Sequence, residues 1–193
     1  MRKIFEEHCM RHRLYKIAYF ISALMLLGAL GLGLFWGDKT QGIHRDTPIE
    51  LPFAVDPHHT VVLLYFGYVG CQNICTPMLE EIATLYHEHT ISSNVGLYFV
   101  NLSTPALGAQ EFASFFHPDF RGIDLHNTPR QALMRACEAY SSDGLIDRDA
   151  LEHTPYLYLV TRDDMGSFRL KYTYISRPLN ATSLRDDITK ELP

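Results

Sequence analysis

Residues 61–77 read VVLLYFGYVGCQNICTP, and the fold of the chain can be worked out from this stretch. Its first six residues are β-branched, aliphatic or aromatic, which is typical of a central strand buried on both faces of a sheet. Pro77 suits the first turn of a helix, where no backbone N–H is needed. The stretch therefore predicts a buried strand, a short turn that carries Cys71 and Cys75, and then a helix.

The segments that follow alternate between strand and helix patterns. Apolar runs predict strands, and apolar residues at helical spacing predict helices. This alternation, closed by two adjacent strands, indicates an α/β fold with a mixed sheet flanked by helices. The predicted strands are 61–66, 95–102, 122–126, 156–161 and 168–174, and the predicted helices begin at Pro77 and span 109–116, 128–140 and 183–192.

Residues 17–36 read IAYFISALMLLGALGLGLFW, an uncharged apolar run long enough to cross a bilayer. Five Lys and Arg residues precede it, against two Glu, which places residues 1–16 in the cytoplasm and the chain after the run outside. A cleaved signal peptide would have a shorter apolar region, and a buried core helix would keep some polar positions. We therefore predict a transmembrane helix at 17–36, a linker at 37–60 and one external domain at 61–193.

The predicted external part of the chain is acidic. The whole sequence holds 17 Lys and Arg and 22 Asp and Glu, and all but five of the former and two of the latter follow the apolar run. An acidic domain argues against nucleic acid as a partner. Because no Arg- and Ser-rich transit segment precedes the apolar run, we expect the bacterial cytoplasmic membrane, with the domain in the periplasm.

Three roles are open for Cys71 and Cys75: metal ligands, a redox-active dithiol, or a structural disulfide. The pair follows a strand, where α/β sheets bind ligands, and begins a helix, whose N-terminus lowers thiol pKa values. We therefore expect a reactive pair, with a lowered pKa for Cys75. Two thiolates are soft ligands that select Cu(I), and His153, directly before a predicted strand, is the candidate third ligand.

The segment YFGYVGCQNICTP and the later EHTPYLYLV together resemble the Sco (SenC) family of membrane-anchored copper chaperones. The resemblance implies a thioredoxin-like domain and copper, as Cu(I) and also Cu(II), held by Cys71, Cys75 and His153. It also implies delivery of copper to the dinuclear copper site of cytochrome c oxidase, on the oxidase's copper-bearing subunit. A related role is reduction of the cysteines of that site, or of other copper and thiol proteins.

The chain departs from the family pattern around these residues. Asn101, in NLSTP, stands where many members have an acid, Glu152 precedes the His where an acid is often found, and Thr76 replaces a Pro after the second Cys. We expect Asn101, Glu152 and Pro155 to surround the ligands. Pro155 also matches the position of a cis-Pro in thioredoxins, and a cis bond there would favour redox chemistry.

We rank three hypotheses. The first is a copper chaperone, a metallochaperone rather than an enzyme, for which no catalytic residue is assigned. The second is a membrane-anchored thiol–disulfide oxidoreductase that uses Cys71 and Cys75. The third is an inert docking domain in which the same pair forms a structural disulfide. Cys137, in a predicted helix, is expected to be a small buried hydrophobic side chain.

Overall fold

The chain divides into two units, Met1–Lys39 and Thr40–Pro193. The computed structural model describes residues 16, 19–26, 28, 42–103, 108–141 and 153–192. In the first unit, residues 19–26 are helical, but among the described residues no helix is long and apolar enough to cross a membrane. Much of the predicted span at 17–36 lies outside the described residues, so the membrane anchor stays a prediction.

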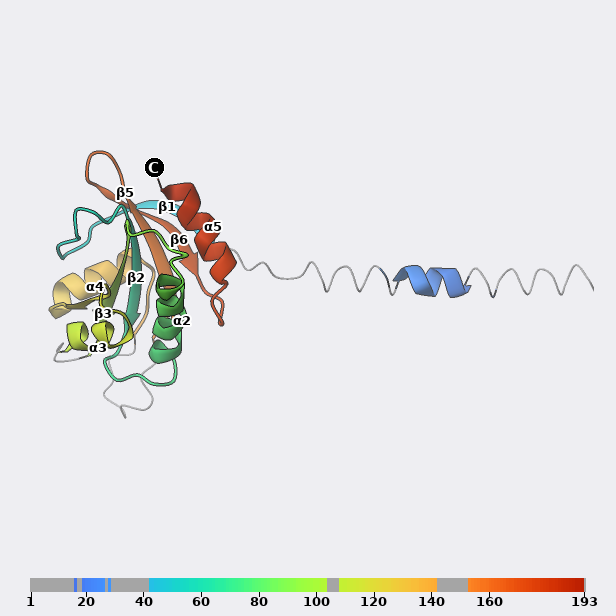
Figure 1. Cartoon of the computed structure of the whole chain (residues 1–193), viewed down its shortest axis with the longest axis horizontal. Coiled ribbons are helices and arrows are strands. Elements are labelled where there is room, and N and C mark those ends of the chain that lie inside the picture. Colours follow the sequence, from blue (N-terminus) through green and yellow to red (C-terminus); the bar gives the residue numbers. More distant parts are fainter. Residues whose placement is uncertain are drawn as a thin grey trace, which may run out of the picture. The chain divides into compact units, whose positions relative to one another are not determined.

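The second unit is built on a six-stranded mixed sheet with the strand order β1-β6-β5-β2-β3-β4 (Figure 1). Strands β2, β3 and β4 run parallel to one another, whereas β5, β6 and β1 continue the sheet in antiparallel pairs. The strands are β1 (Ile43–Ile49), β2 (Val61–Gly67), β3 (Val95–Asn101), β4 (Arg121–Asp124), β5 (Leu157–Arg162) and β6 (Phe168–Tyr174).

The central strands carry the core. All seven residues of β2 and all seven of β3 are buried, as their continuous apolar composition predicts. Successive side chains of a strand point to opposite faces, so Leu63 and Tyr65 join one core cluster while Leu64 and Phe66 join the other. The sheet therefore needs a helical layer on each side.

Helices supply both layers (Figure 1). Helices α2 (Cys75–His87), α3 (Ala109–Phe116) and α5 (Ala181–Glu191) pack on the face that carries Tyr65. Helix α4 (Asn127–Ala136) covers the other face, where Cys137 is buried, as predicted. This arrangement confirms the prediction of a mixed α/β sheet flanked by helices.

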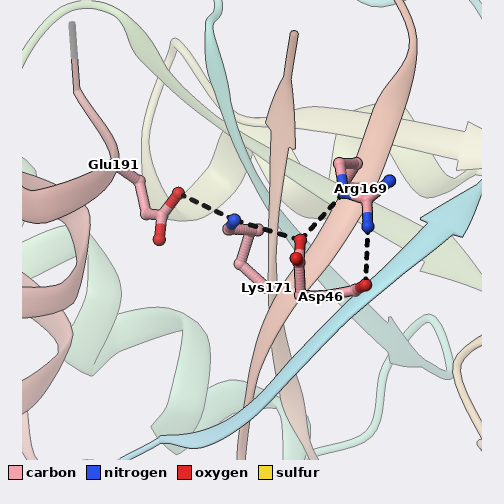
Figure 2. A network of polar contacts seen from close by, with 4 residues as sticks. All are labelled: Asp46, Arg169, Lys171 and Glu191. Carbon is pink, nitrogen blue, oxygen red and sulfur yellow. Dashed lines mark hydrogen bonds and ion pairs between the residues drawn. The ribbon is translucent and has the colours of Figure 1, made fainter.

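Strand β1 corrects the sequence prediction, which placed residues 43–49 in a linker. It pairs antiparallel with β6, and six of its seven residues are exposed, so it lacks the apolar pattern that signals a strand. Figure 2 shows what holds it: Asp46 accepts hydrogen bonds from Arg169 Nε at 2.8 Å and Lys171 Nζ at 3.1 Å, and Lys171 pairs with Glu191 at 3.5 Å. The two cations lower the pKa of Asp46 to about 2.

Candidate metal centre

Three separate segments bring Cys71, Cys75 and His153 together at the carboxyl end of β2. Cys71 lies in the turn after β2, Cys75 is the first residue of α2, and His153 forms an isolated bridge with Ser141 ahead of β5. The two sulfurs and a ring nitrogen of His153 all lie within 4.8 Å of one another. Within the described part of the chain, no other three His, Cys, Asp or Glu side chains are grouped this way.

Gly67 makes room for the sulfur of Cys75. A Cβ atom at position 67 would lie 2.7 Å from Cys75 Sγ and 2.8 Å from Phe99 Cε2, too close for atoms in contact. The Cys75 side chain is fully buried in the space that this glycine leaves against β2. A glycine at the end of a buried strand often marks the close approach of another group, so the sequence carried this signal, although the sequence prediction did not use it.

The ring of His153 is held so that one nitrogen faces Cys75. Its Nδ1 lies 3.2 Å from the carbonyl oxygen of Thr154, a contact that orients the ring. Nε2 lies 3.5 Å from Cys75 Sγ. The ring of Tyr68 packs edge-on against the imidazole, with centroids 5.5 Å apart. His153 is buried and oriented as a ligand nitrogen would need to be.

The turn that carries Cys71 is fixed by its backbone. The Cys71 N–H donates to the Tyr68 carbonyl at 3.1 Å. The Cys71 carbonyl accepts two hydrogen bonds from Thr76, from its N–H at 3.1 Å and from its hydroxyl at 3.0 Å. A Pro at position 76, which the family resemblance leads one to expect, has neither donor. Thr76 therefore gives this chain its own way of closing the turn.

The two thiols have opposite pKa shifts. The pKa of Cys71 falls to about 3, chiefly because the Cys75 thiol hydrogen-bonds to its sulfur, helped by the His153 ring and by the N–H groups of Cys75 and Ile74. The same hydrogen bond, together with burial, raises the pKa of Cys75. The prediction that the helix start lowers the pKa of Cys75 is wrong, because burial and the neighbouring sulfur outweigh the helix N-terminus. These opposite shifts favour the thiolate form at Cys71 and the thiol form at Cys75.

Tyr65 is a neighbour of the centre that the sequence prediction missed. Its ring meets His153 edge-on, with centroids 6.5 Å apart. Burial raises the pKa of Tyr65, and the charge of Cys75 and a hydrogen-bonding contact with its sulfur raise it further. Within the apolar run of β2, Tyr65 looked like one more core side chain. The signal was its position two residues before Gly67, on the same face of the strand.

Asn101, one of the residues expected around the ligands, ends β3 beside Gly67 of β2. It is fully buried, its Nδ2 donates to Asp124 Oδ1 at 2.8 Å, and its Oδ1 accepts the N–H of Ser103 at 2.9 Å. These hydrogen bonds join the ends of β3 and β4. Asn101 thus stabilises the sheet next to the centre, and a role toward the ligands stays a prediction.

Pro155 does not form the cis bond that the comparison with thioredoxins suggested. In the described chain, the cis peptide bond is Arg177–Pro178, and the bond between Thr154 and Pro155 is trans. Pro155 therefore gives no support for redox chemistry. Glu152 lies outside the described residues, and its expected place beside the ligands stays a prediction.

The sequence matches the family model described as SCO1/SenC over residues 54–190, which include all three candidate ligands. The chain belongs to the SCO1/SenC family. A curated relative, the mitochondrial protein SCO2 homolog of Danio rerio, is 26% identical over 140 residues, which cover 68% of this chain and 48% of the relative. This Sco-family chain thus spans about half the length of the curated relative it matches.

Solved structures of Sco proteins share the fold. The apo Sco1 protein of Thermus thermophilus superposes with a TM-score of 0.59 at 20% identity, covering 78% of this chain and 96% of that one. Arabidopsis thaliana ScoI, solved with copper bound, gives 0.56 at 21% identity, with 68% and 83% covered. Bradyrhizobium japonicum ScoI, also with copper bound, gives 0.51 at 20% identity, with 69% and 85% covered. These likenesses confirm the predicted thioredoxin-like fold.

Proposed function

We propose that this Sco-family protein binds copper and delivers it to the dinuclear copper site of cytochrome c oxidase, on the oxidase's copper-bearing subunit. The observation that carries the proposal is the convergence of Cys71, Cys75 and His153 within 4.8 Å. Two thiolates and an imidazole form a soft ligand set, which favours Cu(I), and the imidazole also suits Cu(II). Structural zinc would need a fourth protein ligand.

Each candidate ligand contributes differently. Cys75 and His153 are buried and held in place, by the space over Gly67 and by the Thr154 carbonyl respectively. Cys71 is only partly buried and already favours its thiolate form. Copper is the cargo of this site, so the protein must hold the ion firmly yet keep one ligand within reach of an acceptor.

A Cu(I) titration of the full-length, reduced protein under anaerobic conditions tests the proposal. We expect one tightly bound Cu(I) per chain and much weaker binding by Cys71→Ala, Cys75→Ala and His153→Ala. Cys137→Ala is the matched control, because it removes a buried thiol from the opposite face of the sheet. The proposal is contradicted if the protein does not bind Cu(I) tightly, or if His153→Ala binds Cu(I) as tightly as the unsubstituted protein.

One observation favours a second function, thiol–disulfide exchange. The Cys71 thiolate lies beside the Cys75 thiol, an arrangement suited to attack and resolution. Cys71 would attack a partner's disulfide, form a mixed disulfide and release one partner thiolate. Cys75, after losing its proton, would attack the Cys71 sulfur and release the second. Two electrons then pass to the partner, and the Cys71–Cys75 disulfide remains.

His153 separates the two functions. Copper delivery needs the imidazole as a ligand, whereas disulfide exchange needs only the two sulfurs. We expect His153→Ala to lose copper transfer to the oxidase subunit while it keeps most of its activity toward a small disulfide substrate. Copper transfer that is retained in His153→Ala would count against copper delivery through this ligand set and would favour the oxidoreductase.

We further propose that one N-terminal helix anchors the chain in the bacterial cytoplasmic membrane, with Cys71 on the periplasmic side. The apolar run at 17–36 and the positive charge before it support this placement. A membrane-impermeant maleimide, applied to spheroplasts, should label Cys71 and leave Cys9 unlabelled until the cells are lysed. Labelling of Cys9 in intact spheroplasts would reverse the orientation.

A further inference from the structure

The hydroxyl of Tyr65 is a buried polar group whose polar neighbour is the sulfur of Cys75. The Tyr65 side chain is fully buried in β2, and its hydroxyl makes no hydrogen bond of good geometry among the described residues, but it contacts Cys75 Sγ. A buried hydroxyl that has lost its contact with water is unfavourable unless another group replaces that contact. A buried polar group without a good hydrogen bond calls for an explanation, and a role at a functional site is one such explanation.

The position of Tyr65 indicates what that role is. Tyr65 and Gly67 lie two residues apart on the same face of β2, and the space above Gly67 holds the Cys75 sulfur. Tyr65 and Cys75 belong to the same core cluster, and the Tyr65 ring also packs edge-on against His153. The hydroxyl therefore lies beside the sulfur, on the buried side of the centre.

We propose that Tyr65 is a positioning residue of the metal centre, whose hydroxyl donates a hydrogen bond to Cys75 Sγ when that sulfur is a metal-bound thiolate. The sulfur of a neutral thiol is a weak acceptor, so it gives the hydroxyl little in the metal-free protein. A thiolate is negatively charged and accepts a hydrogen bond strongly. Metal binding would thus turn the weak contact between the Tyr65 hydroxyl and Cys75 Sγ into a strong hydrogen bond. The inference rests on the proposed function, because copper is the metal that forms the thiolate.

Tyr158 provides a matched control. It is also a fully buried tyrosine in a central strand, and its hydroxyl lacks a partner among the described residues. However, it points to the opposite face of the sheet, into the cluster that contains Phe66 and Cys137. Tyr158→Phe therefore removes the same kind of hydroxyl without touching the centre.

The test compares Tyr65→Phe, Tyr158→Phe and the unsubstituted full-length protein. Cu(I) affinity is measured by competition with a chromophoric chelator. We expect Tyr65→Phe to bind Cu(I) about 10- to 100-fold more weakly, the usual effect of removing a group that orients a metal ligand. Tyr158→Phe should bind like the unsubstituted protein. Both metal-free variants should unfold at urea concentrations close to that of the unsubstituted protein, because the Tyr158 hydroxyl has no partner among the described residues and the Tyr65 hydroxyl loses only a weak contact with a thiol sulfur.

A spectroscopic readout separates positioning from packing. Loss of a hydrogen bond to a thiolate raises the energy of the sulfur electrons, so the thiolate-to-Cu(II) charge-transfer band of Tyr65→Phe should move to longer wavelength. Tyr158→Phe should leave the band in place. If Tyr65→Phe has the same Cu(I) affinity and the same charge-transfer band as the unsubstituted protein, the positioning role of Tyr65 is overturned. The proposed function is then unaffected. Failure of the unsubstituted protein to bind copper would overturn both.

Discussion

Replacing Gly67 by Ala tests whether the fold holds Cys75 in place for a ligand. The new Cβ would lie 2.7 Å from Cys75 Sγ and 2.8 Å from Phe99 Cε2, whereas ordinary contacts begin at 3.4 Å. One of these buried groups must therefore move by about 0.6 to 0.7 Å. Overpacking of this kind costs about 1–3 kcal/mol, which we expect as a lower free energy of unfolding in urea.

The same displacement should weaken copper binding. In the metal-free variant, the sulfur relaxes away from the new methyl group, and copper binding must then push it back against that strain. A strain of about 1–3 kcal/mol corresponds to a loss of roughly 5- to 150-fold in Cu(I) affinity. Chelator competition measures this loss.

Gly96→Ala is the control for general overpacking. Its Cβ would overlap the ring of His59, at the other end of the strand pair, where β2 and β3 begin. We expect this variant to lose stability and to keep its copper affinity. The reasoning is refuted if Gly67→Ala binds Cu(I) as tightly as the unsubstituted protein, or if Gly96→Ala loses affinity to the same degree.

Three further predictions concern the turn, the edge strand and the thiols. Because the pKa of Cys71 is about 3, the rate at which iodoacetamide alkylates it should stay constant from pH 8 to pH 5 and fall as the pH drops through 3. A rate that rises tenfold per pH unit toward pH 9 would contradict this. Thr76→Val removes the hydroxyl that donates to the Cys71 carbonyl, and urea unfolding should show a loss of about 1 kcal/mol, with no loss counting against the described turn. Asp46→Asn should lower the melting temperature slightly and less so at high salt, since Asp46 is exposed and its partners are only partly buried. As the folded-state pKa of Asp46 is lowered to about 2, the difference between wild type and Asp46→Asn should be full above the ordinary pKa of 3.8 and vanish as the pH falls through 2; a difference that persists there would exclude the ion pairs as its cause.

The sequence predicted the central sheet because burial on both faces leaves a mark in composition. Strands β2 and β3 are apolar at almost every position. Apolar runs of this length, bounded by turn residues, are typical of strands and are shorter than most helices. Strand β1 leaves no such mark. Its side chains are exposed, and it is fixed by ion pairs to Arg169 and Lys171, more than a hundred residues away in the chain. Pairing at that separation cannot be seen in local periodicity.

At the candidate metal centre, the residues that lie close together were predictable and their environments were not. The family motif singled out Cys71, Cys75 and His153, and their candidate ligand atoms lie within 4.8 Å of one another. The pKa of Cys75 depends on how deeply its sulfur is buried and on the distance to Cys71, and neither follows from a four-residue spacing. The sequence prediction missed Tyr65 for a similar reason. The surroundings of a tyrosine hydroxyl in an apolar strand are known only once the fold is known.

The unequal burial of the three candidate ligands has a consequence for the release of copper. Cys75 and His153 are enclosed by the protein, and Cys71 is the one that solvent partly reaches. An acceptor thiolate would therefore approach from one side and replace Cys71 first, while the other two ligands still hold the ion. If copper is delivered as proposed, the fold would set the order in which its bonds are exchanged, because the two buried side chains would still hold the ion while Cys71 is replaced.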